Sequence, residues 1–169
     1  MERIIKTFER STRDTSYERN LVKEERLTEV FINWCKINGI SYKVNPTDST
    51  ENKAGCDIEI WGSSGNANDI NNKMYIDLKG CQNKYANICL SYERSYDGKR
   101  WFSTLNNRTT TDYVFIDEFD NMLWLPKDEL VQNIQNFKTV NVSPSTAGHW
   151  QRCVLIPKCG MREFNILDK

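Results

Sequence analysis

One part of this 169-residue chain constrains the fold more than any other: a run with helical spacing that leads directly into short runs with strand spacing. Between residues 20 and 38 apolar side chains recur every three or four positions, which predicts an amphipathic helix. These apolar residues are Leu27, Val30, Phe31, Trp34 and Ile37. Gly39 is expected to end the helix. The sequence therefore predicts an early helix with one apolar face.

Five further runs have the apolar pattern of β-strands, and turn-forming residues separate them. The predicted strands are residues 40–44, 56–61, 73–79, 113–116 and 122–125. Residues 45–55 are expected to form a loop, and residues 62–72 a hairpin-type connection. Residues 86–92 fit a strand or a helix, because a short apolar run does not distinguish the two.

The second half of the chain carries weaker patterns. Asp97–Gly98 marks a turn, and Pro126 is expected to begin a short helix with an acidic first turn. Strand-like pieces lie at residues 153–156 and 164–167. The order of elements predicts a mixed α/β (α+β) fold, in a single domain that spans residues 1–169.

Composition excludes several classes of protein. Lys and Arg total 23, and Asp and Glu also total 23, so a generally polybasic binder is excluded. Hydrophobic residues make up 38% of the chain, which is enough for a core. The mean hydropathy is −0.67, and no long apolar run is present to span a membrane. The charged N-terminal sequence lacks the apolar stretch of a secretory signal, and we therefore expect a cytoplasmic protein.

The six cysteines do not have the spacing of a metal site. No two form the C-x2-C pair of structural zinc sites, and the chain has one histidine, His149. A cysteine nucleophile built from Cys153 and His149 lacks a nearby third group to orient it. Four cysteines lie within apolar runs and are expected to be reduced, buried packing residues. These four are Cys35, Cys56, Cys89 and Cys153.

Two neighbouring predicted strands carry the residues with the clearest chemistry. Because strand side chains alternate between faces, Asp77 and Lys79 project to the same side of their strand. Asp57, near the start of the adjoining strand, would bring a second carboxylate beside them. Such oxygen donors suit Mg²⁺, which binds through one or two carboxylates, water and phosphate oxygens. The Lys79 amine can orient or deprotonate a water, or neutralise charge in a phosphoryl transition state.

This arrangement resembles the core hairpin of the PD-(D/E)XK nuclease superfamily, in which an aspartate after a turn precedes an acid-x-Lys strand. Asp57 lies in GCDIEI, and Asp77-Leu78-Lys79 lies in MYIDLKG about twenty residues later. The similarity covers roughly residues 20–130, with a glutamate-bearing helix before the motif and the segments DYVFID and NMLWLPKDEL after it. It implies a restriction-endonuclease-like core, with a central mixed β-sheet flanked by helices.

The resemblance also implies an activity, namely metal-dependent hydrolysis of phosphodiester bonds in nucleic acid by a DNA endonuclease. Asp57 and Asp77 would hold one or two Mg²⁺ (or Mn²⁺) ions with help from Glu24, and Lys79 would position the hydrolytic water. Relatives of this size usually act as homodimers, so a homodimer that binds DNA is expected.

Several side chains near this motif have roles that the sequence leaves open. Glu24 is the preferred helix ligand because it lies near the edge of the apolar face, Glu25 comes next, and Glu29 points almost opposite to that face. Glu59 could join the metal shell, although a surface carboxylate is the commoner outcome. Gln82 could touch the site or be a plain loop residue.

A basic stretch follows the motif. Residues 73–108 carry seven Lys or Arg against three Asp or Glu, which could provide contacts to phosphates with aromatic residues stacking on bases. The predicted nucleic-acid-binding residues are Lys84, Arg94, Lys99, Arg100 and Arg108. The interleaved aromatic residues are Tyr85, Tyr92, Tyr96 and Trp101. The alternative is an ordinary solvated surface.

Other functions fit the same sequence. One is a nuclease-fold module that binds nucleic acid or a partner protein without cutting, and another is a ribonuclease or branched-DNA resolvase. A third is a small α/β interaction module in which the acid-x-Lys triplet is a coincidence. The joint presence of Asp57, Asp77 and Lys79 favours an enzyme.

Overall fold

The computed structural model describes residues 12–47, 49–62, 73–105, 109–142 and 149–164. Its helices are α2 (Thr12–Ile37), α3 (Thr50–Lys53) and α4 (Lys127–Asn133), with short 3-10 helices at Ile134–Asn136 and Lys158–Gly160. One set of strands is β1 (Ser41–Val44), β2 (Ile58–Trp61), β3 (Lys73–Gly80), β6 (Asp112–Ile116), β7 (Met122–Pro126) and β10 (Arg162–Phe164). The other set is β4 (Asn87–Ser95), β5 (Phe102–Ser103), β8 (Lys138–Val142) and β9 (Trp150–Pro157).

These strands form two sheets in the described part of the chain. The first sheet has the order β1-β2-β3-β6-β7-β10, and the second has the order β5-β4-β9-β8. β3 and β6 are parallel, whereas the other pairs of neighbouring strands are antiparallel. The fold is thus a mixture of α and β with a central mixed sheet, as the sequence predicts.

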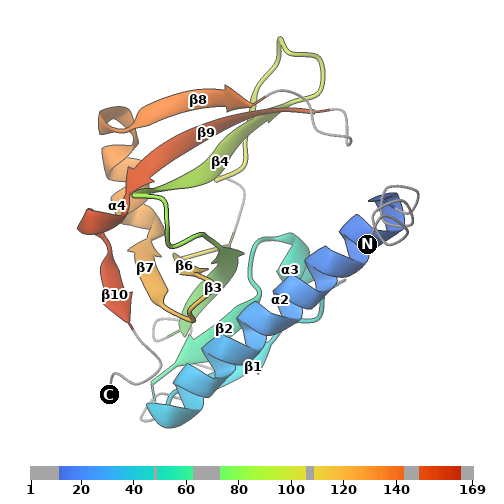
Figure 1. The fold of residues 1–169 in the computed structure, drawn as a ribbon. Coiled ribbons are helices and arrows are strands. Elements are labelled where there is room, and N and C mark those ends of the chain that lie inside the picture. The colour runs from blue at the N-terminus through green and yellow to red at the C-terminus, as the bar shows by residue number, and fades with distance from the viewer. Residues whose placement is uncertain (1–11, 48, 63–72, 106–108, 143–148, 165–169) are drawn as a thin grey trace.

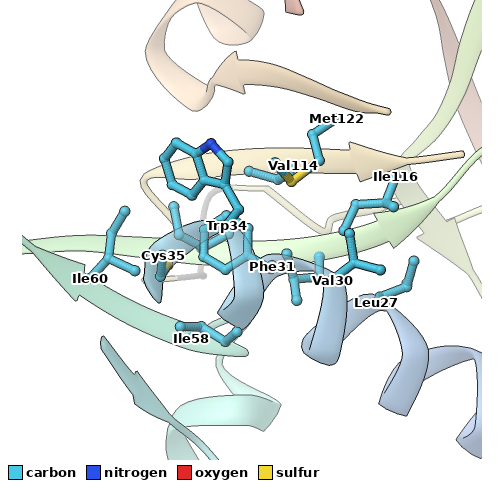
Figure 2. Close-up of a cluster of buried hydrophobic side chains, with 12 residues drawn as sticks. Leu27, Val30, Phe31, Trp34, Cys35, Ile58, Ile60, Val114, Ile116 and Met122 are labelled. Atoms are coloured by element: carbon cyan, nitrogen blue, oxygen red, sulfur yellow. The ribbon is translucent and has the colours of Figure 1, made fainter. Parts of the chain in front are cut away.

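The helix α2 covers one face of the first sheet (Figure 1). Its apolar stripe packs against alternate residues of β2, β3 and β6, and Figure 2 shows these side chains meeting beneath the helix. Phe31 and Cys35 are fully buried there, and the Phe31 ring lies 5.6 Å from that of Trp34 and 6.1 Å from that of Trp124, centre to centre. The predicted helical face is therefore the one that forms the core, apart from Ile37, which is exposed.

The second sheet covers the opposite face of the first sheet. On β6, Val114 and Ile116 belong to the core beneath α2, whereas Tyr113 and Phe115 belong to a second core with β4, β9 and α4. This division follows from the alternation of side chains along a strand. The first sheet is therefore a middle layer, with α2 on one face and the second sheet together with α4 on the other.

The end of α2 shows how the sequence terminates the helix. Gly39 has a φ of +65°, and the Ile40 N–H donates to the carbonyl of Cys35 at 2.9 Å. A residue with a side chain adopts this left-handed conformation only at a cost, so glycine is favoured just past a helix end. The prediction that Gly39 stops the helix is confirmed.

Several predicted boundaries differ from the structure. The helix begins at Thr12 rather than near residue 20, because the turns before Leu27 lack the apolar period on which the prediction depended. Within the predicted loop 45–55 the one-turn helix α3 forms, capped by Ser49, whose hydroxyl accepts from the Asn52 N–H at 3.2 Å. Residues 86–92 belong to a strand, β4.

The C-terminal half holds further differences. Strand β8 was not predicted, because its largely exposed edge sequence KTVNV has no strong apolar alternation. Pro126 is the residue that caps α4 rather than its first helical residue. The predicted piece at 164–167 overlaps β10 at Phe164, and its remaining residues lie outside the described part of the chain, as do most of residues 62–72.

The cysteines follow the prediction in part. All six are free thiols in the described structure, and Cys35, Cys56 and Cys153 are buried, as expected. Burial raises the pKa of these three thiols to about 12. Cys89 is exposed, contrary to expectation, because its position on β4 faces away from the core that holds Ile88 and Leu90. None of the helices in the described ranges combines the length and the apolar character needed to cross a membrane.

Candidate functional site

The candidate site lies where β2 and β3 part. Ile58 pairs with Ile76, and one step further the Asp57 N–H donates to the Ile76 carbonyl at 2.8 Å. Beyond this point β3 continues to Gly80 with β6 on one side, and β2 no longer lies along the other. The backbone N–H of Leu78 donates instead to the Asp57 carboxylate, Oδ2, at 2.7 Å. The side chain of Asp57 therefore takes the place of the missing strand partner.

A second hydrogen bond holds the same carboxylate from the other side. Asn52 on α3 donates from Nδ2 to Asp57 Oδ1 at 2.9 Å. Both oxygens of Asp57 are thus fixed by groups that belong to different elements. Asn52 is not among the residues predicted from the sequence, although the capping motif at Ser49 is the local signal that places a helix turn, and hence Asn52, just before Asp57.

Asp77 and Lys79 lie together on β3, as strand alternation predicts. The Lys79 Nζ is 3.4 Å from Asp77 Oδ2, and Asp77 is only 6% exposed. The intervening Leu78 and the preceding Ile76 are buried in the core beneath α2. The buried side chains of Ile76 and Leu78 therefore hold the Asp77–Lys79 ion pair in place near the end of β3.

The two aspartates influence each other. The pKa of Asp57 is raised to about 6, first because burial disfavours the charged form and then because Asp77 lies close by. The Leu78 N–H and the Lys79 ammonium act in the opposite direction. Two carboxylates near enough to repel each other form a site where a cation is favoured.

A cavity of about 490 Å³ opens beside these residues, between α2 and the segment that joins β1 to α3. Asp57, Asp77, Lys79 and Glu24 all line it. The sequence-predicted catalytic set therefore shares one cavity. Glu25 and Glu29 also line it, and Glu29 does so although we expected it to point away, because the cavity lies along the flank of α2 rather than beneath its apolar stripe.

The side chains of Asp57 and Asp77 are oxygen donors of the kind that hard divalent cations prefer. Two adjacent carboxylates and a cavity open to water match Mg²⁺, which binds through one or two carboxylates and completes its shell with water and phosphate oxygens. Among the described residues, no group of three or more His, Cys, Asp or Glu side chains is placed to hold a metal ion. Asp57 and Asp77 are thus the candidate ligands, with Glu24 on the wall of the same cavity.

Glu59 has a different environment from either of those foreseen. It is buried rather than on the surface, and it does not line the cavity. Its carboxylate lies 3.6 Å from Lys43 Nζ on β1 and 3.7 Å from Lys73 Nζ on β3. The pairing of β2 with both neighbours brings these lysines to Glu59, so this carboxylate has a structural role in the sheet.

Gln82 also lies away from the candidate site. It lines a separate cavity of about 450 Å³ together with Cys81 and Tyr85, and its backbone carbonyl accepts from Lys158 Nζ at 2.6 Å. The loop after Gly80 carries it away from the parted strands.

Strand β4 separates the cations of the predicted basic stretch. Lys84 precedes this strand and lies over the Tyr85 ring, whereas Lys99 and Arg100 are exposed in the turn that follows it. A strand of nine residues spans roughly 30 Å, so these cations do not form one patch. Arg94, near the end of β4, lines a small cavity together with Asp77 and Lys79. Arg108 lies outside the described residues.

Comparisons with protein-family models, with curated proteins and with solved structures found no match to this chain.

Proposed function

We propose that this protein is a metal-dependent phosphodiesterase that acts on nucleic acid, most specifically a DNA endonuclease. One observation carries the proposal: Asp57, Asp77 and Lys79, which are separated by up to 22 positions in sequence, line the same cavity at the point where β2 and β3 part. The Leu78 backbone bond to Asp57 and the Asp77–Lys79 ion pair fix this arrangement. It supports the chemistry that the sequence motif implies.

Each residue has a role in the proposed reaction. Asp57 and Asp77 would hold Mg²⁺ or Mn²⁺, which when bound supplies Lewis-acid polarisation of the scissile phosphate. Lys79, paired with Asp77, lines the cavity, where its side-chain amine would position the attacking water. The water oxygen forms the new bond to phosphorus and loses a proton to bulk water, while the bond from phosphorus to the 3' oxygen breaks and that oxygen takes up a proton from bulk water. The products are a 5' phosphate and a 3' hydroxyl.

The choice of DNA, and the homodimeric state, rest on the resemblance to PD-(D/E)XK nucleases. A homodimer would place two such sites on two strands of a duplex. Sedimentation at working concentration tests this, since activity from a monomer alone would contradict it.

The activity test uses plasmid, single-stranded DNA and RNA with Mg²⁺ or Mn²⁺. Asp77→Asn and Lys79→Ala are expected to lower the cleavage rate by about 100-fold or more, because each removes a group that acts on the reacting phosphate. Asp128→Asn and Lys53→Ala, matched changes at exposed positions outside the cavity, are expected to cut at the wild-type rate. The same rate in wild type and in both site variants would contradict the proposal.

A protein that binds without cutting is the main competing function. Calorimetric titration with Mg²⁺ separates the possibilities. Binding that is lost in Asp57→Asn, together with cleavage, supports the nuclease. Metal binding without cleavage of any of the three substrates favours a binding module, and no Asp57-dependent binding favours an unrelated α/β interaction module.

A further inference from the structure

A second, smaller cavity adjoins the same Asp77–Lys79 pair. It has a volume of about 90 Å³, and β4 and the residues after β5 provide much of its wall. Ser91, Arg94 and Thr104 line it together with Asp77 and Lys79. The second sheet therefore reaches the candidate site, although the sequence motif lies wholly within the first sheet.

Two of the residues that line this small cavity carry a side-chain atom with unmet hydrogen-bonding capacity. Ser91 Oγ and Arg94 Nε are buried, and within the described structure neither has a hydrogen-bond partner. A buried donor without a partner costs free energy, so a ligand that accepts hydrogen bonds from both would be favoured. The backbone around them is held in place, since Thr104 Oγ1 donates to the Ser91 carbonyl at 3.1 Å.

We propose that this cavity is a phosphate subsite, in which Arg94 and Ser91 donate hydrogen bonds to the oxygens of a nucleotide phosphate beside Asp77 and Lys79. The identification of the ligand as a nucleotide rests on the proposed function. Arg94 and Lys79 contribute two positive charges against the single carboxylate of Asp77, so the wall favours an anion. The volume is less than a fifth of that of the 490 Å³ cavity and suits a phosphate rather than a base.

Arg94 differs from its arginine neighbour on β9 in a way that supports this assignment. Arg152 lies in the adjacent strand, where its guanidinium is 3.5 Å from Glu93 and stacks 3.8 Å above the Trp101 ring. The protein itself therefore supplies an ion-pair partner and a stacking partner for Arg152. Arg152 thus provides a matched control for a charge change in the same sheet.

The test measures binding of thymidine 3',5'-bisphosphate, which carries phosphates but no internucleotide bond. Calorimetry in the presence of Mg²⁺ compares wild type with Arg94→Gln, Arg94→Lys, Ser91→Ala and Arg152→Gln, after thermal melts show that each is folded. Arg94→Gln is expected to weaken binding by about tenfold or more, because a charge-assisted hydrogen bond is lost. Arg94→Lys should recover part of the loss, Ser91→Ala should cause a smaller one, and Arg152→Gln should stay within about twofold.

Two results would overturn the phosphate subsite. One is no binding by the wild type, as expected if water alone fills the cavity, and the other is equal weakening by Arg94→Gln and Arg152→Gln. Cleavage assays run in parallel, in which Arg94→Gln is expected to raise KM more than it lowers kcat. Arg94-dependent binding by a protein that cuts nothing would refute the nuclease and leave the subsite standing. Cleavage with unchanged bisphosphate binding in Arg94→Gln would refute the subsite alone.

Discussion

At the scale of single residues, Asp57 is the most constrained polar group of the candidate site. Its carboxylate accepts hydrogen bonds from the Leu78 backbone and the Asn52 side chain, yet burial and the neighbouring Asp77 raise its pKa to about 6. The protein thus keeps a carboxylate whose charged form costs stability. Groups of this kind are common where a site is arranged for function rather than for folding.

The shift in the pKa of Asp57 predicts a pH dependence of stability. Because its pKa is raised above the ordinary value of 3.8, its contribution to stability is fully present below that value and is lost as pH rises through about 6. Asp57→Asn keeps an acceptor for the Leu78 N–H and removes the charge. We expect it to be more stable than wild type by roughly 1–3 kcal/mol at pH 8 without divalent ions, with a smaller difference at pH 4.

Urea unfolding at both pH values measures this difference. Asp128→Asn, at an exposed position of α4, is the control and should show no such dependence. A stability difference between Asp57→Asn and wild type that does not change with pH would contradict the prediction.

At the scale of elements, the one-turn helix α3 supports the candidate site. It places Asn52 against Asp57, and the two residues are five positions apart. Hydrogen bonds to the charged form of a carboxylate lower its pKa, and partners of this kind also set the orientation of a metal ligand. A short surface helix therefore has a direct effect on the site.

Asn52→Ala is predicted to lower Mg²⁺-dependent cleavage by about tenfold, since Asp57 loses a group that orients it. The acidic limb of the pH–rate profile should also move to higher pH, because the ionised carboxylate has lost a hydrogen bond. Steady-state rates measured against pH provide both readouts. Asn133→Ala, whose amide donates to the Glu129 carbonyl on α4, is the control. Wild-type rates and an unmoved profile in Asn52→Ala would show that α3 does not act on the site.

Individual helices and strands differ in how well sequence patterns predict them. The strands at 40–44 and 73–79 are predicted by alternation, and those at 113–116 and 122–125 by short apolar runs, because both patterns are local properties. The neighbouring positions of Asp77 and Lys79 follow from the alternation. The one-turn α3 and the exposed edge strand β8 leave little periodicity to detect. The positions of Ser91 and Arg94 beside the small cavity depend on where β4 packs. The spacing of residues along one strand does not specify which distant strand it pairs with.

At the scale of the whole molecule, the first sheet is a shared middle layer. Phe31 in the core beneath α2 is fully buried and contacts the rings of Trp34 and Trp124, which come from the helix and from β7. Its removal would leave a hole between two layers rather than within one. Loss of this side chain therefore affects the attachment of α2, and with it the wall of the 490 Å³ cavity.

Phe31→Ala is predicted to lower the free energy of unfolding by about 3–5 kcal/mol, from the loss of buried apolar surface and the cavity that remains. Phe119→Ala, at a position 69% exposed, should change it by no more than about 0.5 kcal/mol. Denaturant unfolding followed by tryptophan fluorescence measures both. Similar stabilities for the two variants would mean that α2 is not anchored as the structure indicates.

The parallel pairing of β3 with β6 also bears on biosynthesis. Tyr75 on β3 and Thr111, which leads into β6, are joined across 36 residues, and the chain between them builds β4 and β5. Bringing such distant partners together is slow compared with closing a hairpin. During translation, Asp77 and Lys79 leave the ribosome long before their flanking strand does. A growing polypeptide that stops short of Ile116 has all three motif residues, but β3 then lacks its parallel neighbour β6, so we expect the site to reach its final geometry only after that strand has docked.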